Sequence, residues 1–144
     1  MKIPKIRLVS LLTAVVIVAL AGVSAPAVIY AQSQLGLNIP FDFYVGSQKF
    51  EPGDYTVLVS GSYLKISDRR NHSVFVLTSP VANPGWRSTS GGALVFNRYD
   101  NYYFLTEVRR GGYSSANGLL KAPLEIQVAR ISATKEQIAF QSGH

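Results

Sequence analysis

The sequence predicts a small all-β domain, first an antiparallel β-sandwich and alternatively a small β-barrel, with a short helix near the C-terminus. Three observations predict it. Apolar residues alternate with polar ones over several short stretches, which is typical of half-buried strands. Turn-forming Gly, Pro, Asn and Asp separate these stretches at close spacing, as in antiparallel sandwiches and barrels. One stretch near the C-terminus carries apolar residues at helical spacing instead.

The first predicted strand covers residues 35–45, where every second residue is apolar. Pro40 stands inside it and has no N–H to donate to a neighbouring strand. We therefore expect this strand at an edge of the sheet, or with Pro40 facing away from its neighbour. The motif Glu51-Pro52-Gly53-Asp54 then predicts a type II turn, because Pro suits the first central position and Gly suits the second, where φ is positive.

Two hairpins and one central strand are predicted next. The first hairpin spans residues 55–68 about Gly61-Ser62, and the second spans residues 93–110 about Asp100-Asn101. Between them, residues 73–78 (SVFVLT) are rich in β-branched and aromatic side chains. That composition predicts a central strand buried on both faces.

The longest internal loop is predicted over residues 79–92, which contain two prolines and three glycines and show no periodicity. A loop of this length is often functional, so we expect a site there first. Further on, Pro123 suits the first turn of a helix in which Leu124, Val128 and Ile131 form one apolar stripe. A further strand over residues 123–131 is the alternative.

The N-terminus is typical of a secretory signal peptide. Three basic residues within the first seven precede an uncharged run over residues 8–23, and small residues follow it. We expect cleavage after Ala31, with cleavage after Ala27 as the alternative, and export to the periplasm or the cell surface. An uncleaved anchor competes with this interpretation, because the apolar stretch approaches the roughly 20 residues that cross a bilayer. Pro26 and the small residues around it argue against an anchor.

Cleavage after Ala31 leaves one predicted domain, residues 32–144, and lowers its charge. The removed segment holds three of the 14 basic residues and none of the 8 acidic ones, so the net charge falls from +6 to +3. This mild charge gives little reason to expect a nucleic-acid partner. No membrane span is expected after cleavage. The chain has no cysteine, which excludes disulfides, thiolate metal sites and a lipid-modified cysteine anchor.

Three motifs carry a resemblance to a known family: NIPFDFYVG at residues 38–46, EPGDYTV at residues 51–57 and ALVFNRYDNYYFLTEV at residues 93–108. Together they resemble a family of short, uncharacterised exported proteins of diderm bacteria. The resemblance covers most of the predicted mature domain and implies no activity. The Pro-Gly-x-Tyr turn alone is also similar to turns of transthyretin-like and immunoglobulin-like modules, which favours a sandwich and transfers no function.

No catalytic or metal-binding constellation stands out, and no cofactor is expected. His72 and His144 are the only histidines, and the acidic residues are too scattered to nominate a glycosidase pair. Asp68, His72 and Ser73 lie close in sequence, but a triad is defined by geometry and not by proximity along the chain. We favour a histidine in a surface turn.

Aromatic and basic residues in the long loop and the last hairpin are the candidates for ligand binding. Tyr and Trp combine a flat apolar face with a polar group, which suits sugar rings, peptides or a protein surface. The structural alternatives are a cross-strand tyrosine pair, a tryptophan covering a sheet edge and a solvated strand end at the arginines. The candidates are Trp86, Tyr99, Tyr102, Tyr103 and Arg109.

These observations predict an exported, non-enzymatic binding or structural domain of the cell envelope that acts through protein or polysaccharide contacts. A small secreted hydrolase with its site near Asp68 and His72 is one alternative. The other is a self-assembling envelope subunit in which the strand bearing Pro40 pairs with another copy.

Overall fold

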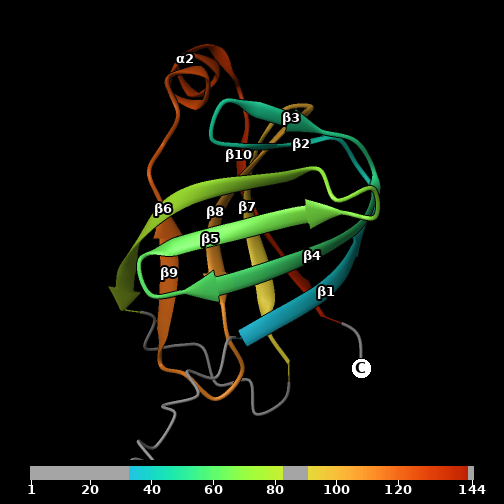
Figure 1. Cartoon of the computed structure of the whole chain (residues 1–144). Coiled ribbons are helices and arrows are strands. Elements are labelled where there is room, and N and C mark those ends of the chain that lie inside the picture. The colour runs from blue at the N-terminus through green and yellow to red at the C-terminus, as the bar shows by residue number, and fades with distance from the viewer. Residues whose placement is uncertain (1–32, 83–90, 143–144) are drawn as a thin grey trace, which may run out of the picture. The chain divides into compact units, whose positions relative to one another are not determined.

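One bent sheet forms the body of the domain. The computed structural model describes residues 33–82 and 91–142, and the ten strands in those ranges join into this sheet. Its first half contains β1, β4, β5 and the start of β6, and the rest lies behind it (Figure 1). The elements are β1 (Ser33–Ile39), β2 (Phe43–Val45), β3 (Gln48–Phe50), β4 (Gly53–Ser60), β5 (Tyr63–Asp68), β6 (Ser73–Ala82), β7 (Ala93–Tyr99), β8 (Tyr102–Arg109), β9 (Ser115–Leu119), α2 (Pro123–Ile131) and β10 (Lys135–Gln141).

The strand β6 belongs to both halves. Its residues 73–77 pair with β5 and its residues 78–82 pair with β9. Figure 1 shows that β6 curves between these parts, so that the two halves face each other with their strands crossing, as in orthogonal sandwiches. Pairing is antiparallel except at the parallel bridge from Tyr44 of β2 to Phe104 of β8. The sheet does not close, which confirms the predicted sandwich and not the barrel.

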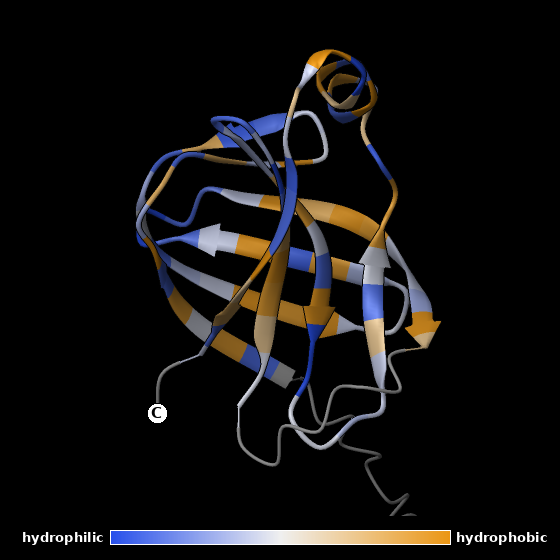
Figure 2. Ribbon diagram, turned by 180° about the vertical axis from the view of Figure 1, so that it is seen from behind, coloured by the Kyte–Doolittle hydropathy of each residue, from blue (hydrophilic) through white to orange (hydrophobic). Residues whose placement is uncertain are grey.

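The hydrophobic core fills the space between the two halves. Along β4 and β5 every second residue faces inward and is buried, as their alternation predicts. Figure 2 shows hydrophobic and hydrophilic residues following one another along the strands. Phe43 lies at the centre, where its ring stacks on Phe50 at 5.3 Å and meets Tyr55 and Phe96 edge-on. Aromatic contacts therefore join the two halves.

Pro40 divides the first predicted strand into two. β1 ends at Ile39 and β2 begins at Phe43, so the prediction of one strand over residues 35–45 is wrong. The edge position is confirmed, because β1 pairs only with β4. Pro40 has no N–H to contribute to a ladder and lies where the chain leaves one half for the other.

The chain changes halves again at Glu51 and Pro52. Gly53 is already the first residue of β4, opposite Ile39, and its φ is not positive. The predicted type II turn is therefore wrong. The described part of β3 pairs with β2 and not with β4, so this segment is a crossing between halves and not a tight reversal.

Both predicted hairpins are confirmed. Ser60 pairs with Tyr63 across the first turn, where Gly61 has a φ of 56°. Tyr99 pairs with Tyr102 across the second, where Asp100 has a φ of 51°. Asp tolerates this left-handed conformation better than most residues, which explains its place there.

The outer face of β6 is not buried, contrary to the prediction for residues 73–78. Val74 and Val76 face the core, whereas Phe75 is 65% exposed and Leu77 is 71% exposed. β6 also continues to Ala82, so the predicted loop over residues 79–92 is wrong in its first four residues. Residues 83–90, which include Trp86, lie outside the described part of the chain.

The predicted C-terminal helix is confirmed as α2, with Pro123 in its first turn. Val128 and Leu124 pack on Tyr99 and Phe104 of the β7–β8 hairpin. Ile131, the third member of the predicted stripe, is exposed because the helix ends there.

Candidate functional site

The turn between β5 and β6 holds the Asp68–His72 pair that a hydrolase would need. Oδ1 of Asp68 accepts the backbone N–H groups of Arg70 and His72 at 2.8 and 2.9 Å, and Oδ2 lies 3.0 Å from Nδ1 of His72. Asn71 adopts a φ of 63°, which closes the turn. Asp and Asn commonly stabilise turns in this way. The carboxylate thus holds the turn together.

Burial raises the pKa of Asp68, but the hydrogen bonds from the backbone and ring of His72 and from the backbone of Arg70 outweigh it. The pKa of Asp68 therefore lies below its ordinary value of 3.8. The His72 side chain is 72% exposed, and no described hydrogen bond joins it to Ser73. The structure therefore does not assemble Asp68, His72 and Ser73 into a triad.

Replacing Asp68 with Asn should lower the free energy of unfolding at neutral pH, because the turn loses its charge-assisted hydrogen bonds. A carboxyl group whose folded pKa is depressed contributes stability above its ordinary pKa, and that contribution is lost as the pH falls through the folded value. The stability difference between wild type and Asp68→Asn should therefore shrink below about pH 3.8. Urea unfolding from neutral to acid pH measures it, and a difference that stays constant would contradict the assignment.

Two open grooves flank this turn. One, of about 410 Å³, lies between β3 with the Glu51–Pro52 crossing and the turn after β5. The other, of about 590 Å³, lies along β1 and β4 and shares Asp54, Tyr55, Asp68 and Arg69 with the first. Arg69 forms an ion pair with Asp54 between them. Within the described ranges, no group of three or more His, Asp or Glu side chains is arranged to hold a metal ion.

The candidate tyrosines of the last hairpin do not form one surface. Tyr99 is buried under α2, where its hydroxyl donates to Glu125 at 3.2 Å. Tyr102 is 43% exposed and stacks on Phe104. Tyr103 is half-buried and stacks on Phe41 at 4.0 Å.

The remaining two candidates add nothing to that surface. The Arg109 guanidinium is largely buried and bonds to Glu107 at 3.1 Å. Trp86 lies outside the described residues. The cross-strand pairing of Tyr99 with Tyr102 favours the structural interpretation for these two tyrosines.

The most distinctive surface is one that sequence reasoning missed. Five side chains share the outer face of β4, β5 and β6, and we call them the outer patch. Its members are Leu58, Tyr63, Lys65, Phe75 and Leu77. Leu58, Lys65 and Phe75 form one cross-strand row, and Tyr63 pairs with Leu77 in another.

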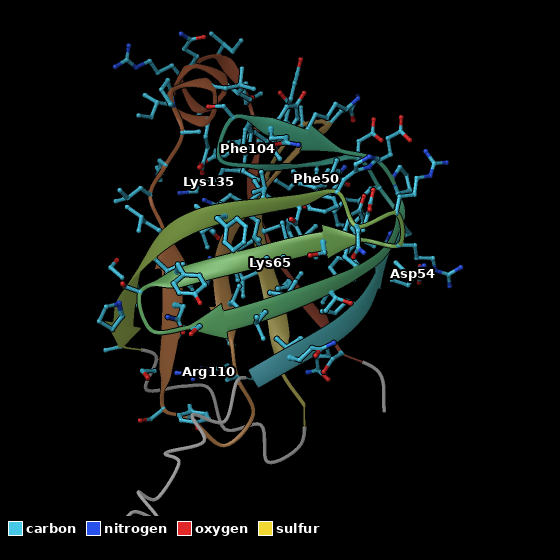
Figure 3. The ribbon with its side chains drawn as sticks, viewed as in Figure 1. Phe50, Asp54, Lys65, Phe104, Arg110 and Lys135 are labelled. Atoms are coloured by element: carbon cyan, nitrogen blue, oxygen red, sulfur yellow. The ribbon has the colours of Figure 1, made fainter. Side chains whose placement is uncertain are left out.

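The outer patch is apolar around a single charge. Phe75 lies 6.2 Å from Tyr63 between ring centroids, and Nζ of Lys65 lies 5.6 Å from the centre of the Phe75 ring. Figure 3 shows Lys65 on β5, in the middle of the front half of the sheet. In the described ranges, no carboxylate forms an ion pair with Lys65. The sequence pattern can show which of these side chains share a face. It cannot show that no other layer of the protein covers that face.

Comparison with known proteins gives no function for this chain. No protein-family model, curated protein or solved structure matches the chain. Among the described residues, no helix has the length and apolar character needed to cross a membrane. The outer patch and the two grooves are therefore the features on which a function is argued.

Proposed function

We propose that residues 32–144 form an exported, non-enzymatic binding domain of the cell envelope, and that its outer patch binds a partner protein. The observation that carries the proposal is the exposure of Phe75 and Leu77 next to Tyr63 on one face of the sheet. Contiguous exposed apolar side chains on a soluble domain mark interaction sites. The signal-peptide pattern of the N-terminus supports export.

Lys65 supports a choice among possible partners. It lies within the apolar side chains of the outer patch and has no described acidic partner, so it suits a protein surface that offers a carboxylate among apolar groups. A second copy placed face to face about a two-fold axis at Lys65 would bring two like charges together. Phe75 and Leu77 have no hydrogen-bonding groups in their side chains, which suits a protein better than a polysaccharide.

Site-specific crosslinking tests the proposal. A photo-crosslinking residue at position 75, introduced in the native cells, should form an adduct with one other protein. The same residue at position 131, which is also exposed but lies at the end of α2, should not. An adduct between two copies of the chain, or no adduct at position 75, would overturn the proposal.

The partner identified in this way should then bind the double variant Phe75→Ser, Leu77→Ser at least about tenfold more weakly, because two truncated contacts at an interface centre commonly cost more than about 1.4 kcal/mol. The matched control is Ile126→Ser, Ile131→Ser, which removes two exposed apolar side chains of α2 and should leave the affinity unchanged. Isothermal titration calorimetry measures both. Binding of purified envelope polysaccharide that depends on Phe75 would instead support the polysaccharide alternative.

A further inference from the structure

We infer that the partner adds an extended strand to the edge of β6 over residues 73–76, next to the outer patch. This inference rests on the proposed function and specifies how the partner is held. It is carried by the direction of the backbone groups in β6, by the groove at the start of that strand and by the side chains on the other sheet edges.

The backbone groups of β6 alternate between its two sides. Thr78 donates its N–H to the carbonyl of Ser62, and Asp68 donates its N–H to the carbonyl of His72. In an antiparallel pair the residues that bond to the neighbour alternate with those that face away. Val74 and Val76 therefore direct their N–H and C=O groups to β5, whereas those of Ser73 and Phe75 point to the opposite side.

No described strand pairs with that opposite side over residues 73–76. β9 begins to pair with β6 only at Thr78. Val74 and Val76 face the core yet are only partly buried, as expected for a strand with an open side. Backbone groups at such an edge form a template for another strand.

The 410 Å³ groove reaches His72, the residue that precedes this edge. It is bounded on one side by Gln48, Lys49 and Phe50 of β3 and on the other by the turn that ends at His72, immediately before β6. β3 also has an edge that no described strand covers. The groove therefore gives an extended chain room up to the residue before the open edge.

The other open edges carry the polar side chains that normally discourage strand addition. The outward residues of β1 are Gln34, Gly36 and Asn38. β10 begins with Lys135, Glu136 and Gln137, and β3 begins with Gln48 and Lys49. Among the open edges of the described strands, that of β6 carries the exposed Phe75, with the exposed Leu77 just beyond it.

The length of the edge favours a single segment of a partner over a second copy of this chain. The open part is short, because β9 pairs with β6 from Thr78 onward and the turn after β5 ends at His72. If a second copy used its own β6 here, it would also bring its β9 and its turn after β5, which limit the open part of β6. An extended segment needs only the width of one strand, and its side chains can then contact Phe75 on the outer face.

A phage-displayed library of random linear nonapeptides, selected on the purified mature domain, provides the probe. The selected peptides should alternate apolar and polar residues. In the complex, hydrogen exchange at the backbone amides of Ser73 and Phe75 should slow at least tenfold. The amides of Val74 and Val76 already bond to β5 and should change little.

N-methylation of alternate peptide amides supplies the matched control. Methylating the amides on one edge of the peptide should weaken binding at least tenfold, and methylating those on the other edge should not. Equal effects of the two, protection at β1 or β10 instead, or failure to select any peptide would overturn strand addition. Protection of Ser73 and Phe75 by self-association without peptide would favour a second copy and would also overturn it.

These outcomes separate the inference from the proposed function. If position 75 forms an adduct with a partner protein and that complex leaves the Ser73 and Phe75 amides unprotected, the outer patch binds a surface and not a strand. The proposed function would then stand without strand addition. If position 75 forms no adduct, the proposed function itself is wrong.

Discussion

Replacing Phe43 with Ala should lower the free energy of unfolding by about 3–5 kcal/mol, as is usual when a buried Phe is truncated. The Phe43 side chain is completely buried. It contacts Phe50 and Phe96 of its own half of the sheet and Tyr55 of the opposite half. The cavity left by Ala would therefore lie between the two halves of the sheet. Neither half could close the cavity without moving relative to the other.

Phe75→Ala is the matched control for this prediction, because it removes the same atoms from a side chain that is 65% exposed. Its unfolding free energy should change by less than about 1 kcal/mol. Urea unfolding followed by tyrosine fluorescence compares the two variants. A loss of similar size at both positions would mean that Phe75 is covered in the free domain, which would also contradict the outer patch.

The contrast between these two phenylalanines shows what the sequence can predict about the fold. Alternation predicts which residues of one strand share a face, and the buried residues of β4 and β5 do alternate with less buried ones. Turn chemistry predicted the Gly61-Ser62 and Asp100-Asn101 hairpins. Both patterns depend only on residues close together in the sequence, so they can be interpreted without knowledge of the rest of the molecule.

The errors arose where burial depends on distant parts of the chain. Residues 73–78 have the composition of a buried strand, but whether a second layer covers Phe75 is decided by where other elements pack. Pro40 and Gly53 carry turn signals that the fold uses at crossings between halves and not in a single strand or a tight reversal. The outer patch was therefore beyond reach from the sequence.

The candidate site shows the same division. The surface-turn interpretation of Asp68 and His72 rests on neighbouring residues and agrees with the hydrogen bonds of that turn. The separation of Tyr99 from Tyr103 depends instead on which face α2 covers. Glu125 was missed for that reason. In the sequence it is one of several scattered acidic residues, and the sequence does not show which side of residues 123–131 packs against the sheet.

Glu125 is only 2% exposed and is the central acceptor of a buried polar cluster under α2. Its Oε1 accepts from Nδ2 of Asn97 at 2.9 Å and from the hydroxyl of Tyr99 at 3.2 Å. Burial, followed by the negative charge of Glu125, raises the pKa of Tyr99. The phenol therefore stays protonated in alkaline solution and donates a hydrogen bond to Glu125. This cluster fixes α2 to the β7–β8 hairpin together with Val128.

Replacing Glu125 with Ala should lower the free energy of unfolding by about 2–4 kcal/mol, because two buried donors lose their acceptor and each unsatisfied group costs about 1–3 kcal/mol. Glu125→Gln keeps an oxygen in the same place and should cost less than about 1.5 kcal/mol. Gln127→Ala, on the exposed side of the same helix, should change stability by less than about 0.5 kcal/mol. Urea unfolding of the three variants measures these differences.

A double-mutant cycle then assigns the loss to the cluster. Tyr99→Phe removes one donor, so its cost should be smaller in the Glu125→Ala background than in the wild type, by about 0.5–1.5 kcal/mol. If the two losses simply add, Glu125 stabilises α2 by some means other than its bond with Tyr99. An equal loss for Glu125→Gln and Glu125→Ala would show that the negative charge matters, rather than the position of the acceptor oxygen.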